Sequence, residues 1–328
     1  MRAAVITRAG GPEVLEIQDV PRPLPGAGEV LIRVKASALN RADMLQRQGR
    51  YPAPPGAPAN IPGLEFAGEV VDAGPKVVRW KPGNRVFGII GGGGHAEFLV
   101  AREAEVARIP DSMTWEDAAA IPEAFITAHD ALVTLAAMRK GDVVLIHAVG
   151  SGVGLAAVQL VKALGGVAVG TARSADKIQR AKALGLSQGA VLGDDLQSLA
   201  GHVHHWTDGK GVNVVLDLVG GPYLPASIEC AAPLSRVILI GLLAGRSATL
   251  NLGAILNKRV MVRGTVLRAR PPAEKAAATQ AFERDVLPLL ERGTVRPVID
   301  GVFPLDQIRD AHARMESNAS FGKIVLTV

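Results

Sequence analysis

The sequence predicts an α/β protein of two domains, one with a doubly wound parallel sheet and the other rich in β-strands. Three observations lead to this fold class. The chain has 328 residues, more than the roughly 250–300 at which a single core stops growing. Up to Pro122, short β-type runs alternate with glycine and proline. From Glu123 to Thr265, apolar β-branched runs alternate with helical stretches, the pattern of a parallel sheet with helices on both faces.

The first predicted domain covers residues 1–122 and consists mainly of strands. Its runs of β-branched and apolar residues are "RAAVIT", "VLIRVKA", "FAGEVVDAG", "RVFGII" and "AEFLVA". The glycine run "IIGGGGH" (89–95) is expected to be a turn between two strands, because neither a helix nor a lysine follows it as in a phosphate loop.

The second predicted domain covers residues 123–265, and residues 266–328 return to the first. The strands expected in the second are "VVLIHAV", "VAVGTA", "GAVLG", "VNVVLDLVG" and "RVILIGLL". After them, "PAEKAAATQAFERDVLPLLERG" predicts one long helix, "GVFPLDQIRDAHARMES" a second helix, and "GKIVLTV" a last strand.

Composition narrows the class of protein. No run reaches the ~18 apolar residues of a membrane span, and Met1 leads into "RAAVITRAGGPE" without the regions of a signal peptide. We therefore expect a cytoplasmic protein with no membrane partner. Cys230 is the only cysteine, which excludes a disulfide scaffold and cysteine-rich zinc sites. The net charge of +5 is scattered among acids, so a nucleic-acid groove is not expected.

The strongest chemical signal is "GDVVLIHAVGSGVGLAAVQLVKALGG" (141–166), where a buried strand meets a glycine-rich turn that opens a helix. Glycines let the backbone approach a pyrophosphate, and the N–H groups at the helix start hold the anion. The spacing departs from G-x-G-x-x-G, because a register ending at Gly154 puts Val149 and Ser151 in the first two glycine places. A turn that only packs helix against strand is the alternative. The expected cofactor contacts here are Ser151, Gly152 and Val153.

The residues at the end of the next predicted strand indicate which type of cofactor binds. An enzyme that uses NAD places an acid about 20 residues after the glycine turn, where it binds the ribose hydroxyls. Here the sequence reads "GTARSADK", with no acid before Asp176. Arg173, Ser174 and Lys177 surround a helix start that favours a 2′-phosphate, so we expect NADPH. Solvated charges at a helix end are the alternative interpretation of Arg173 and Lys177.

Two segments that contain histidine are expected to have neither a metal-binding nor a catalytic role. The histidines of "GHVHHWTDG" follow an amphipathic helix, with no cysteine beside them and no i, i+4 ligand spacing. His147 lies near Ser151, but the segment is not a G-x-S-x-G elbow and has no evident acid partner. We expect surface histidines and no hydrolase.

The chain as a whole resembles the zinc-free quinone oxidoreductases of the medium-chain dehydrogenase/reductase superfamily, and the zeta-crystallin group in particular. The resemblance is carried by "SALNRAD", "HAVGSGVG", "AAAIPEAFITAHDAL" and "GKIVLTV", and most specifically by the pairing of "LNRAD" with "RQGRYPAPPGAP". It implies a Rossmann domain for the parallel sheet and a GroES-like catalytic domain for the β-rich part.

This resemblance also implies roles for individual residues. Asn40 is expected beside the nicotinamide and ribose, Tyr51 at the substrate mouth and Thr127 near the cofactor, and these three are the expected catalytic residues. Where close relatives carry a tyrosine near the adenine phosphate, this chain has Leu192, so one phosphate hydrogen bond is expected to be missing. Further residues are placed along the cofactor by the resemblance: Val219, Gly241, Leu242, Thr265, Val266, Leu267 and Asn318.

Two of these residues have plainer alternatives. Asn40 precedes "RADMLQRQ" and could cap that helix. The Tyr51 ring could pack against "PAPPGAP" with its hydroxyl in water.

The resemblance also implies a site without metal. Zinc-dependent relatives place a metal-binding cysteine where this chain has Asn40 and a metal-binding histidine where it has Leu64. Amide and phenol donors remain, which can hold a carbonyl oxygen as negative charge develops. That chemistry suits conjugated carbonyls, which delocalise the charge of an incoming hydride.

The expected function is therefore hydride transfer from NADPH to quinones or related conjugated carbonyls. The partners expected are a small quinone or enone and a second copy of the chain, paired through the run "RVMVRGTVL" (259–267). Two alternatives stay open: an NADPH-dependent enone or enoyl reductase, and an NADPH-binding protein with a nucleic-acid-binding or structural role.

Overall fold

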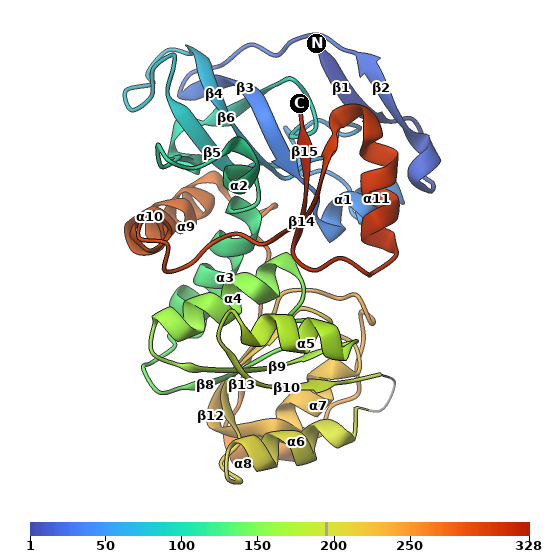
Figure 1. Cartoon of the computed structure of the whole chain (residues 1–328), viewed down its shortest axis with the longest axis vertical. Helices are drawn as coiled ribbons and strands as arrows, with labels where there is room; N and C mark the ends of the chain where they lie inside the picture. Colours follow the sequence, from blue (N-terminus) through green and yellow to red (C-terminus); the bar gives the residue numbers. More distant parts are fainter. Residues whose placement is uncertain (194–195) are drawn as a thin grey trace. The chain divides into compact units, whose positions relative to one another are not determined.

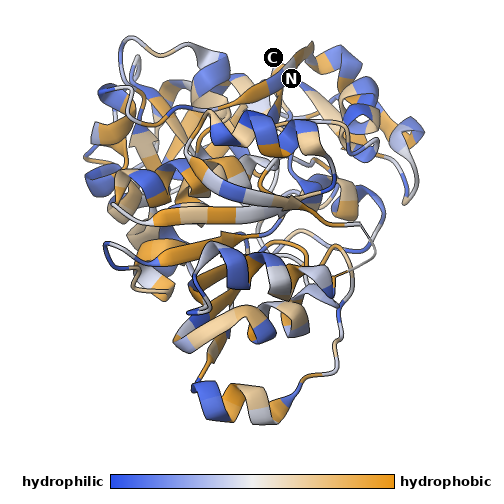
Figure 2. Ribbon diagram, turned by 60° about the horizontal axis from the view of Figure 1, so that its bottom comes forward, coloured by the Kyte–Doolittle hydropathy of each residue, from blue (hydrophilic) through white to orange (hydrophobic). Residues whose placement is uncertain are grey.

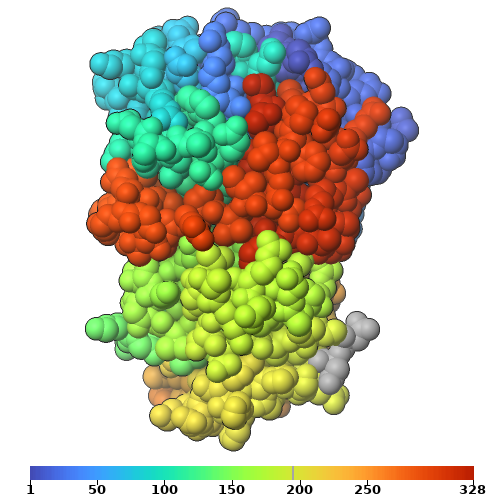
Figure 3. Space-filling view, viewed as in Figure 1, coloured from blue at the N-terminus to red at the C-terminus, as the bar shows by residue number. Residues whose placement is uncertain are grey.

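The computed structural model describes residues 1–193 and 196–328. The chain forms two compact units. Unit 1 comprises Met1–Ile126, Leu267–Arg292 and Pro297–Val328, and unit 2 comprises Thr127–Val266 and Gly293–Arg296. Figure 3 shows the orange and red C-terminal residues beside the blue and cyan N-terminal residues of unit 1. The sequence placed its boundaries at 122/123 and 265/266, and did not predict the short return at residues 293–296.

Unit 2 contains a six-stranded sheet in which every neighbouring pair is parallel. Its order is β10-β9-β8-β11-β12-β13. Numbered along the chain, this order is 3-2-1-4-5-6, the Rossmann order. The predicted fold class is therefore confirmed. The strands are β8 (Val143–Ile146), β9 (Val167–Ala172), β10 (Leu186–Val191), β11 (Val212–Asp217), β12 (Ala231–Leu239) and β13 (Met261–Gly264).

Helices cover both faces of this sheet (Figure 1). On one face α4 packs on β8 and β9, and α5 packs on β9 and β10; on the other, α7 and α8 pack on β12. The strands are largely hydrophobic (Figure 2), because a sheet covered on both faces needs apolar residues on each. The helices and helical turns are α3 (Thr127–His129), η4 (Asp130–Leu135), α4 (Gly152–Ala163), α5 (Ala175–Lys182), α6 (Ser198–Trp206), α7 (Tyr223–Cys230) and α8 (Leu252–Lys258).

Unit 1 is built around a mainly antiparallel sheet in the order β14-β15-β3-β4-β5-β7, with β6 also paired to β3. Only β14 and β15 run parallel among its described pairs. A separate hairpin joins β1 to β2. The strands are β1 (Arg2–Ile6), β2 (Leu15–Asp19), β3 (Glu29–Ala38), β4 (Glu65–Ala73), β5 (Arg85–Ile89), β6 (Phe98–Arg102), β7 (Val106–Arg108), β14 (Ile299–Pro304) and β15 (Lys323–Thr327).

Short helices surround the sheet of unit 1. The glycine run at 89–95 is a turn between β5 and β6, as predicted. The helices and helical turns are η1 (Pro12–Val14), α1 (Arg41–Arg47), η2 (Glu103–Glu105), α2 (Trp115–Ala119), η3 (Pro122–Ile126), α9 (Pro272–Asp285), α10 (Leu287–Glu291), η5 (Leu305–Gln307) and α11 (Ile308–Glu316).

Two predicted elements of unit 1 were wrong in part. The single helix expected over 272–293 is divided at Val286 into α9 and α10, because Pro288 has no N–H to continue the hydrogen-bond ladder. The helix expected over 301–317 begins only at Ile308, and the residues before it form β14 and the helical turn η5. There, pairing with β15 overrides a helix-like pattern.

Candidate functional site

The glycine-rich turn of unit 2 joins β8 to α4 and is fixed by local hydrogen bonds. Ser151 caps α4: its Oγ accepts from the Gly154 N–H at 3.1 Å and donates to the Ala148 carbonyl at 2.8 Å. The Ser151 hydroxyl thus holds the turn itself. A Cβ on Gly154 would lie 2.5 Å from the Ala148 oxygen, so only glycine lets the helix start this close to the strand.

The same turn has the features of an anion cradle. Gly152 and Val153 are the first two residues of α4, and N–H groups at these positions have no carbonyl to bond within a helix. Ala148 holds a left-handed backbone with φ of 55°, a conformation that costs a non-glycine residue about 1 kcal/mol or more and that concentrates at functional sites.

Two of the predicted phosphate-binding residues lie at the start of α5, next to the glycine turn. Ser174 is the N-cap of α5 and accepts from the Lys177 N–H. A Cβ on Gly150 would lie 2.9 Å from Lys177 Cδ, so the lysine stem crosses the glycine turn. Arg173, at the end of β9, is exposed. Both cations therefore lie near the carboxyl ends of β8 and β9.

The predicted cofactor residues of unit 2 follow the carboxyl ends of all six strands. Ser151 follows β8, Arg173 follows β9, Leu192 follows β10, Val219 follows β11, Gly241 and Leu242 follow β12, and Thr265 and Val266 follow β13. Ligands of doubly wound sheets bind at this edge. The Leu192 side chain itself packs in the core of unit 2, with Leu145 and Val169.

Asp217 was missed by the sequence analysis. It ends β11, and its Oδ1 accepts from the N–H groups of Val219 and Gly220 at 2.9 and 2.8 Å. Its Oδ2 is buried and has no hydrogen-bond partner within the described part of the chain. Burial raises the pKa of this carboxyl. The sequence signal was an acid at the end of a predicted strand, shortly before "GG". In the structure, the carboxylate of this acid fixes the loop that carries Val219.

Unit 1 brings together three polar residues from three strands. Asn40 follows β3, Glu65 begins β4 and Lys323 begins β15, and β3 pairs with both of the other strands. Lys323 Nζ donates to Glu65 Oε1 at 2.5 Å, to Asn40 Oδ1 at 2.7 Å and to the Leu39 carbonyl at 2.9 Å. Asn40 Nδ2 donates to Glu65 Oε1 at 2.8 Å. Glu65 and Lys323 are buried.

Asn40 also caps helix α1, the plainer role considered for it. The Asp43 carboxylate accepts the Asn40 N–H at 2.7 Å and the Gly63 N–H at 2.8 Å. Burial raises the Asp43 pKa to about 6 in spite of these bonds. The reciprocal carboxylate fixes the helix start, while the Asn40 side chain faces Lys323 and Glu65.

Glu123 places a second carboxyl group beside Glu65. Its N–H donates to Glu65 Oε2 at 2.8 Å, and its own Oε2 is buried without a hydrogen-bond partner among residues 1–193 and 196–328. Burial and the neighbouring Glu65 charge raise the Glu123 pKa to about 8. Burial also raises the pKa of Glu65, against the opposing effect of Lys323. Glu123 therefore carries a proton at neutral pH.

Tyr51 is held by Arg268, which the sequence analysis also missed. The Arg268 guanidinium lies over the tyrosine ring, 5.1 Å from its centre, and donates to Gln46 Oε1 and to the Gly91 carbonyl. The ring thus stacks on a buried cation. Burial raises the pKa of the Tyr51 hydroxyl, so it is a neutral donor at physiological pH.

The remaining predicted site residues lie as follows. Thr127, the first residue of unit 2, has a buried Oγ1 with no hydrogen-bond partner in the described ranges. Leu267 is buried and begins the second segment of unit 1. Asn318 has φ of 59° and accepts from Arg41 at 2.5 Å.

Comparison with known proteins decides the family. Residues 26–111 match the model of the alcohol dehydrogenase GroES-like domain, and residues 188–326 match that of a zinc-binding dehydrogenase. A quinone oxidoreductase of Pseudomonas aeruginosa is 35% identical over 97% of this chain and 96% of its own. The chain belongs to the zinc-free quinone oxidoreductase family of medium-chain dehydrogenase/reductases. It is therefore related to oxidoreductases along its whole length.

Several solved structures share this fold, and their names give different cofactors or activities. A mycobacterial protein, Rv1454c, complexed with NADPH aligns with a TM-score of 0.89 at 28% identity, and both chains are covered completely. An NAD-dependent alcohol dehydrogenase aligns at 0.87 with 33% identity, again over both whole chains. The CurK enoyl reductase aligns at 0.86 with 27% identity over 99% of this chain and 98% of its own.

Asn40 and Leu64, which the resemblance places at the metal-binding positions of zinc-dependent relatives, lie in unit 1. Leu64 is buried and apolar, and Asn40 is bonded to Lys323 and Glu65. Nearby, His95 Nδ1 lies 2.8 Å from Ser37 Oγ, and burial lowers the His95 pKa to about 3. Within the two described ranges, no three His, Cys, Asp or Glu residues are grouped as metal ligands.

Two other histidines of this chain are held by hydrogen bonds or by ring stacking. His147 is buried between Thr171 Oγ1 and Ser227 Oγ, at 3.0 and 2.8 Å, and burial lowers its pKa to about 3. His202 stacks on Trp206 with ring centres 5.6 Å apart. His147 is thus bonded to Thr171 and Ser227, while the Ser151 hydroxyl is bonded to the Ala148 carbonyl.

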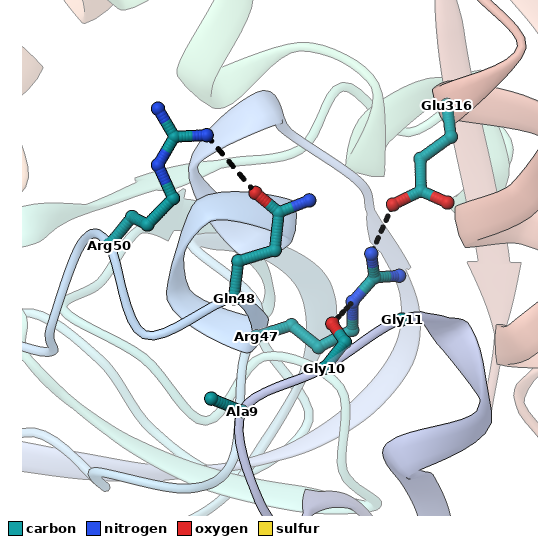
Figure 4. A pocket seen from close by; sticks show the side chains of 7 residues that line it. All are labelled: Ala9, Gly10, Gly11, Arg47, Gln48, Arg50 and Glu316. Carbon is teal, nitrogen blue, oxygen red and sulfur yellow. Dashed lines mark hydrogen bonds and ion pairs between the residues drawn. The ribbon is translucent and has the colours of Figure 1, made fainter.

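Asn40 caps the N-terminus of α1, and a surface pocket lies at the C-terminal end of this helix. Figure 4 shows the residues that line the pocket. The pocket has a volume of about 480 Å³ and is lined by Arg47, Glu316, Arg50 and their neighbours. The Arg47 guanidinium donates hydrogen bonds to the Glu316 carboxylate and to the Gly10 carbonyl. None of the predicted site residues lines this pocket, so it is not part of the candidate site.

Of the helices described, none has both the length and the apolar character needed to span a bilayer.

Proposed function

We propose that this chain is an NADPH-dependent quinone oxidoreductase that transfers hydride without a metal. The observation that carries the cofactor assignment is the series of predicted contacts at the carboxyl ends of five of the six strands in a 3-2-1-4-5-6 sheet, Leu192 after β10 being buried in the core. The name of the Pseudomonas aeruginosa relative supports quinones as substrates. Bound NADPH would supply the hydride.

The chain's own groups have separate tasks in this proposal. The N–H groups of Gly152 and Val153 bind the pyrophosphate, and Arg173 and Lys177 bind the 2′-phosphate. Asn40 donates from Nδ2, and the Tyr51 hydroxyl donates to the substrate oxygen as negative charge develops there. Thr127, Leu267 and Asn318 complete the proposed cofactor contacts. The cytoplasmic location stays a prediction.

An NADPH-dependent enoyl reductase is the second candidate, supported by the likeness to the CurK enoyl reductase. Both activities use the same cofactor and a conjugated carbonyl, so the two differ in which acceptor is reduced fastest.

The test is loss of the reduced-nicotinamide absorbance when acceptors are added to protein and NADPH. The panel contains an ortho-quinone, a para-quinone and an enone, each with and without a chelator. We expect the fastest turnover with a quinone, unchanged by the chelator. Faster turnover of the enone would favour the second candidate. Loss of activity in chelator, or one zinc per chain by elemental analysis, would refute the metal-free mechanism. Salt-sensitive RNA binding without turnover would favour a non-enzymatic role.

A further inference from the structure

A buried lysine lies against the proposed catalytic amide. Lys323 is 4% exposed, and its ammonium meets three acceptors: the Leu39 carbonyl, Asn40 Oδ1 and Glu65 Oε1. An ammonium has three hydrogens and no lone pair, so all its donors are occupied. Lys323 has no hydrogen left for a substrate oxygen and can therefore act only through its neighbours.

The chemistry of these neighbours fixes the orientation of the Asn40 amide. Lys323 can only donate, so the amide oxygen must face it, and the Glu65 carboxylate accepts from Asn40 Nδ2 at 2.8 Å. Rotating the amide by half a turn would put two donors together and two acceptors together. The second hydrogen of Nδ2 points to the Ala38 carbonyl at 3.4 Å, a distance at which a hydrogen bond is weak.

We propose that Lys323 is a positioning residue, which holds the Asn40 amide so that the weakly bonded N–H of Nδ2 is presented to the nicotinamide cofactor or the substrate carbonyl. This inference rests on the proposed function for the identity of the ligand. In this proposal Lys323 orders a donor and does not contact the substrate.

The test is a double-mutant cycle of Lys323→Met and Asn40→Ala. Two quantities are measured for each variant: the dissociation constant for NADPH, by titration of nicotinamide fluorescence, and kcat/KM with an ortho-quinone. If Lys323 acts through Asn40, each single variant loses roughly tenfold or more in at least one quantity, and the double variant loses no more than Asn40→Ala alone. Losses that multiply in the double variant would refute the proposal, and so would an unchanged Lys323→Met.

A matched control separates positioning from general destabilisation. Lys275 is partly buried and forms another ion pair in unit 1, with the buried Glu105 at 3.0 Å. Lys275→Met should lower the melting temperature but leave the NADPH affinity and kcat/KM unchanged. If Lys275→Met reduced both as much as Lys323→Met does, the effect would come from lost stability and the proposal would fail.

A second background keeps the test possible if Lys323→Met does not fold. Removing the lysine alone leaves the Glu65 charge buried and unpaired, so the cycle is repeated with Glu65→Gln in every variant. The expected result is the same lack of additivity. Absence of quinone turnover in the wild type would refute the proposed function, while the fluorescence titration would still decide the role of Lys323.

Discussion

The Arg268 guanidinium lies over the Tyr51 ring, 5.1 Å from its centre. This contact depends on the aromatic face and not on the hydroxyl. A phenylalanine at position 51 would keep it, so Tyr51→Phe removes the hydroxyl and leaves the packing of its ring. The pair therefore allows the chemical role of Tyr51 to be separated from its structural one.

We expect Tyr51→Phe to lower quinone turnover while NADPH affinity stays nearly unchanged. Loss of one transition-state hydrogen bond typically costs about 2–4 kcal/mol where the donor acts as in an oxyanion hole. The measurements are steady-state kinetics with an ortho-quinone and a fluorescence titration with NADPH. The melting temperature serves as the control for packing. Unchanged kinetics would show that Tyr51 only packs.

The double variant Arg173→Ala/Lys177→Ala should raise the Michaelis constant for NADPH and leave that for NADH almost unchanged. Charge-assisted bonds to phosphate contribute roughly 1.5–3 kcal/mol each, so the partly solvated pair should favour NADPH by about tenfold or more in the wild type. Arg180→Ala/Lys182→Ala, at the other end of α5, is the matched control and should change neither constant. Equal losses for both cofactors would show that Arg173 and Lys177 only support the fold.

The Glu123 carboxyl predicts a pH dependence of stability. Its pKa is raised from 4.5 to about 8 in the folded chain, so the folded state binds the proton more tightly than the unfolded state. The stability gained from that proton is complete below about pH 4.5 and is lost as the pH rises through about 8. Above pH 7, the raised Asp43 pKa of about 6 contributes little further change.

The free energy of unfolding should therefore fall by up to about 1 kcal/mol between pH 7 and 8 in the wild type, and by less in Glu123→Gln. Denaturant unfolding at a series of pH values measures both slopes. Identical slopes in the two proteins would mean that Glu123 is ionised in the fold at pH 7.

Strand β13 predicts self-association. It pairs with β12 on one side, its residues are exposed, and among the described strands no other lies beside it. An apolar edge of this kind favours pairing with another strand, so we expect a homodimer at micromolar concentration. Val262→Lys should shift sedimentation toward the monomer. Val302→Lys, on the edge strand β14 of unit 1, is the control and should leave the dimer intact. A monomeric wild type would contradict the prediction.

The fold could be predicted from the sequence wherever local pattern and tertiary structure agree. In unit 2 the alternation of apolar runs and helices indicated the parallel sheet, because each strand and its following helix are neighbours along the chain. Strand β14 was missed, since its pairing with β15 depends on contacts that no local window contains. Pro288 is a local signal for the division between α9 and α10 that the prediction of one long helix did not use.

The residues of the candidate site likewise fall into those that the local sequence predicts and those that depend on tertiary contacts. The glycine turn and the basic residues of α5 follow one another in the sequence and could be predicted. The bonds of Lys323 to Glu65 and of Arg268 to Gln46 join positions 258 and 222 residues apart. A lone lysine in "GKIVLTV" has no pattern that distinguishes it from a solvated one. Only the pairing of β15 with β3 brings it to Asn40.

The order of β3 and β15 along the chain affects the order of events during synthesis. The strands of the unit 2 sheet lie between Val143 and Gly264, so that sheet has all its partners before β15 is synthesised. In β3, Ala36 to Ala38 pair with β15 and keep an open edge until β15 emerges from the ribosome. Until then a nascent chain exposes an unpaired strand next to the future Asn40 site, the kind of surface on which chaperones act and aggregates nucleate.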